Sequence, residues 1–341
     1  TNNSKGGALF IAAGAAVTLA GATTFMNNSA AYGGAISVGD DSVVSWGDSN
    51  NDEITILTFA NNSASLYGGA VYISDNSTAS WTGATAFIGN YADDEGGAVC
   101  LTGRSSLYSS PSITAAGGGG TGQDGLTSFV SNSAFERGGA LVAWYNSTVS
   151  FGGENTTFVD NIAKYGAAIY SKSGSNISFL GGGDILIERG TLLCLGPTRF
   201  IGNSATDGQG GAVYVYEGSE VSWSGSDTLF VENTADVGGA VYITDSVNVS
   251  WGEGGGVTTF ELNRAKSNGG AIGCSVGDSQ KSTSVINIDG ETNFIGNSCG
   301  SYGGALVLTS AVRMNLGPGS REVFSGNSAG AGGGAVFLSA A

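Results

Sequence analysis

The stretch from Phe230 to Trp251 reads FVENTADVGGAVYITDSVNVSW, and variants of it recur along the whole chain. It contains a Phe followed three residues later by an Asn, then a small residue, then a Gly-Gly-Ala turn that leads into an alternation of apolar and polar residues. Self-similarity at a period of about thirty residues is typical of solenoid proteins. We therefore interpret residues 1–341 as a single repeat domain.

Each repeat contains three short apolar alternations separated by turns. The first follows Gly-Gly-Ala, as in Ala70–Ile73; the second ends in an aromatic residue, as in Val221–Trp223; the third carries the Phe of the FxxN motif. Alternations rich in Val, Ile and aromatic residues, bounded by Gly, Asn and Asp, indicate β-strands, and no helical period is present. The sequence predicts an all-β fold, a right-handed parallel β-helix (β-solenoid) of about eleven three-strand coils.

In-register stacking would place equivalent residues of successive coils directly above one another. The FxxN phenylalanines should then form one internal column, and a second should contain Trp46, Trp81, Phe151, Phe179, Trp223 and Trp251. The FxxN asparagines should form a ladder in which each amide bonds to backbone and to its neighbours. The glycine pairs would allow positive φ and close approach at the bend. The predicted ladder residues are Asn28, Asn62, Asn90, Asn132, Asn161, Asn203, Asn233, Asn263, Asn297 and Asn327.

The composition limits the classes of partner. The chain has 60 Gly and only 3 Pro, but 41% hydrophobic residues is sufficient for a packed core. A net charge of -16 argues against nucleic acid, which is bound by clustered Lys and Arg. Because no apolar run is long enough to span a bilayer, we expect no direct membrane insertion by this chain. A stacked array needs polar caps, so we expect it to be part of a longer protein.

The four cysteines are interpreted from the repeat positions that they occupy. Cys299 takes the position held by Ala in other repeats, and Cys274 takes that of Ile73 and Ile243. Both are expected to be small apolar core residues, with a Cys274–Cys299 disulfide between neighbouring coils as the alternative. Cys100 takes the outward position of Tyr72, and the remaining cysteine lies in an apolar LLCL run.

Two repeats are longer than the others, and their insertions, at 109–126 and 181–198, both fall between the second and third strands. Smaller excursions leave from the same turn. Loops carried by a rigid scaffold often bind ligands. The possible binding residues on these loops are Asp48, Asp52, Glu53, Asp124, Glu188 and Arg189.

The sequence offers little chemistry for catalysis or metal binding. With no histidine, Ser-His and Cys-His nucleophile schemes are excluded, and we assign no catalytic residue and no cofactor. The acidic clusters Asp40–Asp41 and Asp93–Glu95 could supply paired carboxylates, but both fall in turns, where solvated carboxylates are common. A weak calcium candidate at Asp48, Asn50 and Asp52 lacks the glycine of a calcium loop.

Eight N-glycosylation sequons occur in the chain. Four of them begin near the start of the second strand, where period-two alternation directs the asparagine outward. Glycans are therefore predicted at Asn76, Asn146, Asn176 and Asn248 in a host that performs the modification.

FxxN paired with GGA[ILV], repeated over essentially the whole chain, resembles the repeats of the chlamydial polymorphic membrane proteins. Its regular Ser-Trp element departs from that pattern, which leaves open a eukaryotic (algal) or viral relative. The resemblance implies a β-helical autotransporter passenger, displayed at the cell surface and implicated in adhesion.

These considerations lead to one functional prediction with two alternatives. We expect an extracellular or cell-surface structural and adhesive module, not an enzyme, that acts as a rigid display rod. Its partners would be other protein chains or cell-surface ligands, with self-assembly as a further mode. The alternatives are a subunit of an extracellular filament or appendage, and a carbohydrate-active β-helix lyase or hydrolase.

Overall fold

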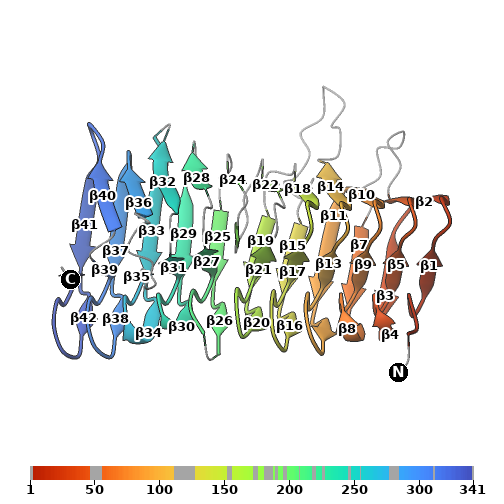
Figure 1. The fold of residues 1–341 in the computed structure, drawn as a ribbon, viewed down its shortest axis with the longest axis horizontal. Coiled ribbons are helices and arrows are strands. Elements are labelled where there is room, and N and C mark those ends of the chain that lie inside the picture. Colours follow the sequence, from red (N-terminus) through yellow and green to blue (C-terminus); the bar gives the residue numbers. More distant parts are fainter. Residues whose placement is uncertain are drawn as a thin grey trace.

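A computed structural model describes residues 3–46, 56–110, 127–151, 156–171, 176–179, 187–188, 191–194, 198–206, 208–216, 220–224, 227–244, 247–253, 255–275, 284–309 and 312–339. Within these ranges the regular elements are β-strands, and no helix long and apolar enough to cross a membrane was found there. The strands pair in parallel with the equivalent strands of neighbouring coils, along the long axis of the rod (Figure 1). The prediction of an all-β parallel solenoid is confirmed.

The strands that follow the Gly-Gly turns form the GGA sheet, which has 12 strands. They are β1 (Leu9–Ile11), β5 (Ile36–Val38), β9 (Val71–Ile73), β13 (Val99–Leu101), β17 (Leu141–Ala143), β21 (Ile169–Ser171), β23 (Ile187–Glu188), β27 (Val213–Tyr216), β31 (Val241–Thr244), β35 (Ile272–Ser275), β39 (Leu306–Leu308) and β43 (Val336–Leu338).

The tryptophan sheet has 11 strands and contains the aromatic ends of the second alternation. They are β2 (Ala16–Leu19), β6 (Val43–Trp46), β10 (Thr78–Thr82), β14 (Ser106–Ser110), β18 (Thr148–Phe151), β22 (Asn176–Phe179), β24 (Thr191–Cys194), β28 (Glu220–Ser224), β32 (Asn248–Glu253), β36 (Ser284–Ile288) and β40 (Val312–Leu316).

The phenylalanine sheet has 10 strands, each with one FxxN phenylalanine. They are β3 (Thr23–Met26), β7 (Ile56–Ala60), β11 (Ala84–Ile88), β15 (Thr127–Val130), β19 (Thr156–Val159), β25 (Thr198–Ile201), β29 (Thr228–Val231), β33 (Val257–Glu261), β37 (Glu291–Ile295) and β41 (Arg321–Ser325).

A fourth sheet, here called the corner sheet, follows the ladder asparagines and also has 10 strands. They are β4 (Ser29–Tyr32), β8 (Ser63–Tyr67), β12 (Tyr91–Ala92), β16 (Ser133–Ala134), β20 (Ile162–Ala163), β26 (Ser204–Ala205), β30 (Thr234–Val237), β34 (Arg264–Asn268), β38 (Ser298–Cys299) and β42 (Ser328–Ala329). The prediction of three strands per coil is therefore wrong, because the short segment after each asparagine, often Ser-Ala, also pairs from coil to coil.

The insertion predicted at 181–198 is described only in part. Within it, β23 adds to the GGA sheet and β24 adds to the tryptophan sheet. Their apolar alternation continues the two sheets, although neither FxxN nor GGA is present. Residues 181–186, 189–190 and 195–197 lie outside the described part of the chain. Of the first insertion, Ser109 and Ser110 end β14, and residues 111–126 lie outside the described part of the chain.

The core lies inside the coil and contains the two predicted aromatic columns. Phe230 stacks between Phe200 and Phe260, with ring centroids 3.9 and 4.6 Å apart. Trp251 stacks on Trp223 at 5.6 Å and meets Phe260 edge to face, at an interplanar angle of 90°. Stacked rings bury a large apolar area per coil, so the columns contribute strongly to the hydrophobic stabilisation, together with the buried Val, Ile, Leu and Ala residues of the core. The side chains of the predicted column members Phe151 and Phe179 lie outside the described part.

The FxxN asparagines stack at the turn between the phenylalanine sheet and the corner sheet. The Asn233 amide nitrogen donates to Asn263 Oδ1 at 2.9 Å and to the Phe200 carbonyl at 3.0 Å. Its own Oδ1 accepts from the backbone nitrogen and the side-chain amide of Asn203, both at 3.0 Å. Amide-to-amide bonds run from Asn28 to Asn327 along the rod. The ladder thus satisfies backbone groups that a buried turn would otherwise leave unpaired.

The two glycines of each turn have different tasks. Gly238 has φ 63°, in the left-handed region that side chains disfavour. Gly239 has ordinary φ, but an added Cβ would lie 2.2 Å from the carbonyl oxygen of Gly270 in the next coil. The first glycine therefore allows the bend, and the second allows adjacent coils to approach closely.

The described cysteines are free thiols, so the alternative of a Cys274–Cys299 disulfide is wrong. Cys274 pairs in register with Ile243, and Cys299 lies between Ala265 and Ala329, as predicted from their repeat positions. Burial raises the pKa of both thiols.

Candidate functional site

One part of the outer surface carries aromatic side chains, on the GGA sheet away from the main core. The middle residues of β9, β13, β17 and β21 point outward and form a second buried cluster of Tyr72, Cys100, Val142 and Tyr170. We call this cluster, with the side chains that pack on it, the aromatic face. Those added residues are Tyr32, Tyr67, Trp144, Tyr165 and Tyr214.

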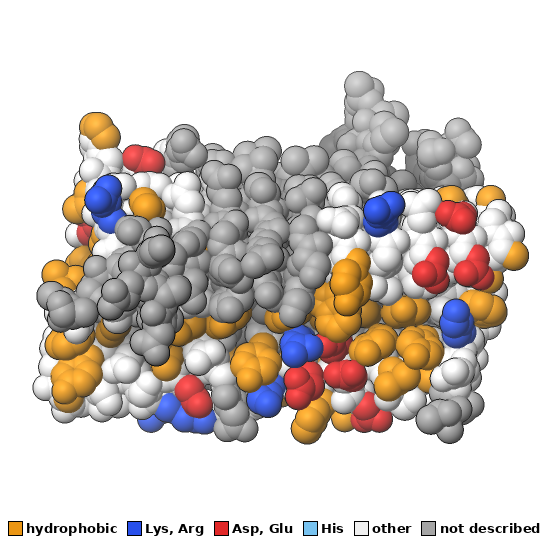
Figure 2. All heavy atoms as spheres, in the orientation of Figure 1, with side chains coloured by type: hydrophobic (Ala, Val, Ile, Leu, Met, Phe, Trp, Pro, Cys, Tyr) orange, Lys and Arg blue, Asp and Glu red, His pale blue; other side chains and the backbone are white. Residues whose placement is uncertain are grey.

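The aromatic face is built by ring-to-ring contacts between coils. The ring centroid of Tyr32 lies 5.2 Å from that of Tyr72 and 5.8 Å from that of Tyr67. The ring centroids of Tyr67 and Trp144 are 6.1 Å apart. Tyr145 meets Trp144 edge to face and is 56% exposed. Figure 2 shows hydrophobic side chains gathered beside acidic and basic ones on this side of the rod. Cys100, predicted to point outward, does so but is buried beneath these rings, which raises the pKa of its thiol.

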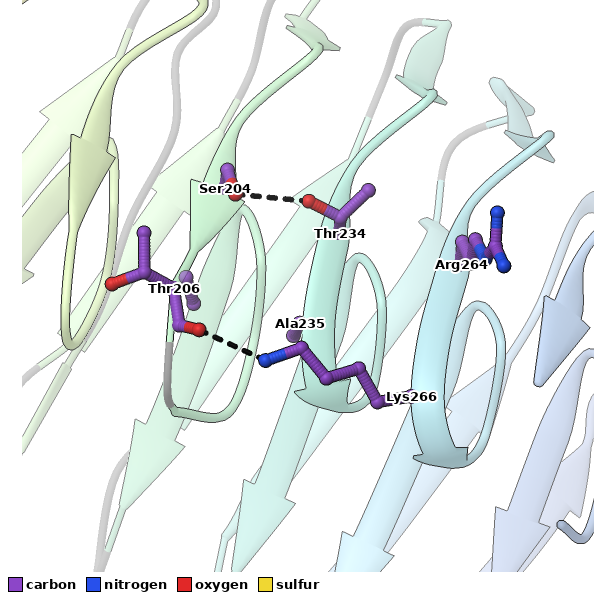
Figure 3. Close-up of a pocket in the computed structure, with 7 residues that line it drawn as sticks. Ser204, Thr206, Thr234, Ala235, Arg264 and Lys266 are labelled. Atoms are coloured by element: carbon purple, nitrogen blue, oxygen red, sulfur yellow. Dashed lines mark hydrogen bonds between the residues drawn. The ribbon is translucent and has the colours of Figure 1, made fainter. Parts of the chain in front are cut away.

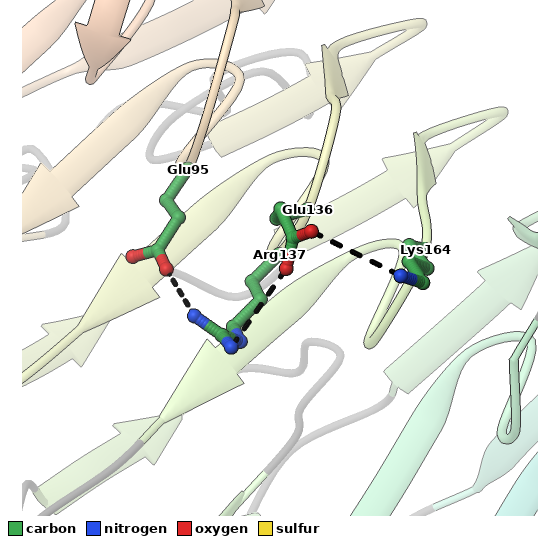
Figure 4. Close-up of polar contacts among 4 residues, drawn as sticks. All are labelled: Glu95, Glu136, Arg137 and Lys164. Atoms are coloured by element: carbon green, nitrogen blue, oxygen red, sulfur yellow. Dashed lines mark hydrogen bonds and ion pairs between the residues drawn. The ribbon is translucent and has the colours of Figure 1, made fainter.

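Beside the aromatic face lies an ion cluster of Glu95, Glu136, Arg137 and Lys164. Arg137 Nη1 donates to Glu95 Oε1, and Arg137 Nη2 lies 3.8 Å from Glu136 Oε2 (Figure 4). Lys164 Nζ lies 3.9 Å from Glu136 Oε1, and the Arg137 guanidinium lies 5.3 Å above the ring of Tyr170. The cluster joins three successive coils to the aromatic face.

Register explains why these charges meet. In this region, the residue immediately before each Gly turn forms a parallel bridge with the equivalent residue of a neighbouring coil. These residues are Tyr67, Glu95, Arg137 and Tyr165. Aligning that single position along the sequence would have placed Glu95 beside Arg137. In the sequence, Glu95 stands out only as part of the acidic run Asp93–Glu95, so the pairing was not predicted.

Glu95 is 1% exposed, and its second carboxylate oxygen has no hydrogen-bond partner among the described residues. Burial raises the pKa of Glu95 to about 7, and the bond from Arg137 opposes this increase. Burial also raises the pKa of Asp94, and it raises the pKa of Tyr67 to about 12. A carboxylate that is closed off and bound to Arg is typical of a structural ion pair, so the cluster gives no support to a catalytic carboxylate pair.

The raised pKa predicts a dependence of stability on pH. In the unfolded chain Glu95 releases its proton near pH 4.5, whereas in the folded rod it keeps the proton until about pH 7. Raising the pH through this window therefore favours the unfolded state. We expect the free energy of unfolding, relative to Glu95→Gln, to fall by on the order of 1–3 kcal/mol between pH 4.5 and 7.

Urea titrations of both proteins at several pH values measure this difference. Glu136→Gln is the control, because it removes a partly exposed carboxylate of the same ion cluster. A constant gap between the parent protein and Glu95→Gln across the window would contradict the prediction.

The loop residues singled out from the sequence lie largely outside the described part. This applies to the calcium candidate Asp48, Asn50 and Asp52, and also to Glu53, Asp124 and Arg189. The backbone of Glu188 lies in β23. Within the described ranges, no group of three or more His, Cys, Asp or Glu residues is arranged to hold a metal ion.

Of the four predicted glycan acceptors, Asn76, Asn146 and Asn248 are exposed. Asn76 and Asn146 have positive φ in the turn before the tryptophan sheet, and Asn248 lies in β32. The Asn76 amide donates to Asp41 at 2.9 Å. The side chain of Asn176 is not among those described. Glycosylation at all four remains a prediction.

Five segments of the chain match the family model of the Chlamydia polymorphic membrane protein repeat, at residues 22–39, 56–80, 197–216, 257–275 and 323–339. In these five segments the chain is similar to the polymorphic membrane protein repeat family. Each matched segment contains an FxxN phenylalanine, its ladder asparagine and the following Gly-Gly turn. The family model thus covers the repeat elements that form the phenylalanine sheet, the corner sheet and the GGA sheet. Searches of the curated proteins and of the solved structures found no significant match.

Proposed function

We propose that this chain is a cell-surface structural and adhesive module, a rigid β-helix that presents the aromatic face to other protein chains or cell-surface ligands. The repeat family and the solenoid fold fit a surface-exposed β-helix module. The observation that carries the adhesive role is the aromatic face with its adjoining ion cluster. Tyr, Trp and Arg are the residues enriched where protein interfaces bind most strongly.

The aromatic face has the form that a contact surface needs. Its central residues are buried and held by neighbouring coils, so little conformational freedom is lost on binding. Its edge is accessible, because Tyr145, which packs edge to face on Trp144, is 56% exposed. The rod below it is rigid, since all four sheets run through this region.

Adhesion can be tested with beads coated with the purified chain and applied to cultured epithelial cells. In the double variant Trp144→Thr, Tyr145→Gly, the two positions take the residues of the preceding coil, Thr102 and Gly103, so the fold should be retained. We expect bead attachment to fall about ten-fold or more, because buried aromatic contacts dominate binding energies.

The control for this experiment removes a large apolar side chain from another sheet. Leu229→Thr gives the residue found at the same position in the next coil, Thr259, and should leave attachment unchanged. Attachment no greater than that of albumin-coated beads would exclude the adhesive role. Equal attachment of the double variant and the parent chain would exclude the aromatic face as the adhesive surface.

A further inference from the structure

A pocket of about 320 Å³ lies across β26, β30 and β34, on the outer side of the corner sheet. It is lined by the hydroxyl-bearing residues Ser204, Thr206 and Thr234 and by the cations Arg264 and Lys266 (Figure 3). The volume is in the range of sites that hold small molecules. The strands β26, β30 and β34 that carry the pocket lie further along the rod than β12 and β16 (Figure 1), and the pocket shares no residue with the ion cluster.

Arg264 breaks the repeat pattern of the corner sheet. The aligned residues in its nearest coils are Ser204, Thr234, Ser298 and Ser328. Across the ten strands of this sheet, Arg264 is the only charged residue at that position. A hydroxyl is sufficient for the fold there, so the guanidinium is not required by coil stacking.

The two cations of the pocket differ in their partners. Lys266 Nζ lies 2.7 Å from Asp236 Oδ1 and donates to the Thr206 carbonyl at 3.0 Å, so its charge is balanced within the protein. Arg264 is exposed and forms no hydrogen bond or ion pair with any described residue. Its five N–H donors and its positive charge are therefore available to a ligand.

The hydroxyl groups add a donor aligned with the arginine. Thr234 donates its hydroxyl proton to Ser204 Oγ at 3.0 Å, which leaves the Ser204 proton without an acceptor among the described residues. Ser204 and Arg264 line the same pocket, two strands apart, with Thr234 between them (Figure 3). A guanidinium and a hydroxyl donor that line one pocket suit an oxyanion, because arginine binds the oxygens of sulfate, phosphate and carboxylate groups in pairs.

The charge of the whole chain restricts the kind of anion. With a net charge of -16, the chain repels an extended polyanion. At physiological salt, however, fields are screened within about 8 Å, so a single ester group close to Arg264 would mainly experience the local cation. We propose that this pocket binds a saccharide-sized ligand that carries one sulfate or phosphate monoester, with the ester oxygens on Arg264 and Ser204.

The test is an NMR titration of the labelled chain with glucose 6-sulfate, glucose 6-phosphate and glucose. Both esters share the proposed chemistry, and the tighter one identifies the preferred group. We expect the Arg264 side chain and the Thr234 amide to shift with the esters and not with glucose. Arg264→Ser, which places the residue of neighbouring coils at this position, should bind at least about ten-fold more weakly, since it loses charge-assisted hydrogen bonds.

Arg313→Ser is the matched control, because it removes the same charge from an exposed position of the tryptophan sheet. It should bind as the parent chain does, and circular dichroism should show equal melting for both variants. Unchanged ester binding by Arg264→Ser, equal losses in both variants, or equal shifts with glucose would each overturn the proposal. The pocket is independent of the adhesive role, so failure of bead attachment would leave this result standing.

Discussion

Replacing Asn233 by Leu is expected to destabilise the rod by on the order of 3–5 kcal/mol. The leucine would remove the acceptor of the Asn203 backbone nitrogen and side-chain amide, and the donor to the Phe200 carbonyl. Because Asn203 and Asn233 are fully buried, water cannot replace these bonds. Each buried polar group left unpaired costs about 1–3 kcal/mol.

Urea denaturation measures the loss in Asn233→Leu, and hydrogen exchange at the Asn203 amide locates it. Asn28→Leu is the control at the first rung, where the side chain donates to Asn62 but its oxygen accepts no hydrogen bond from a described residue. Its loss should be much smaller. Equal losses at the two rungs would show that side-chain volume, rather than the ladder, sets the cost.

Gly239→Ala is expected to lower the free energy of unfolding by about 3–5 kcal/mol, as much as Asn233→Leu, although Gly239 has an ordinary φ. The new Cβ would lie 2.2 Å from the Gly270 carbonyl oxygen and 2.7 Å from backbone atoms of Arg264. These are backbone atoms of the next coil, so no side-chain movement can relieve the clash, and the coils must separate locally. Thermal melting followed by circular dichroism should show a large decrease in Tm.

Gly334→Ala tests the same position in the last coil that the structure describes. The nearest atom to its added Cβ is 3.6 Å away, so this variant should melt as the parent chain does. A similar decrease in Tm for both variants would contradict the steric explanation. At Ala167 the chain itself has an alanine in place of the second glycine of the turn. In that coil, β21 shares only one residue pair with the next strand of the GGA sheet, β23.

The repeated residues made the interior of the rod predictable from sequence. Phe230, Trp251, Asn233 and the glycine pair recur at fixed positions, and parallel stacking turns each recurring position into a column. The same logic placed Cys274 among the core residues. Backbone pairing is less visible, because the two-residue corner strands have no alternation to count, and the fourth sheet was therefore missed.

The features proposed to bind ligands could not be read from the repeat pattern, because they are departures from it. Glu95 and Arg137 are separated by 42 residues, and only the coil-to-coil register brings them together. The isolated character of Arg264 depends likewise on which residues stack around it. The differing insertions are visible in the sequence, whereas finding which exposed positions of regular coils lie side by side requires every position to be aligned in register, and the FxxN and GGA motifs do not by themselves draw attention to these positions.

The direction of the hydrogen bonds gives the rod a mechanical property. Strand pairing occurs between coils, so the bonds lie along the long axis (Figure 1). Tension between the two ends would open these bonds a few at a time, and each detached coil, such as the 30 residues from Asn233 to Asn263, would release roughly 100 Å of extended chain. A tether of this kind lengthens in steps under load and keeps the remaining coils folded.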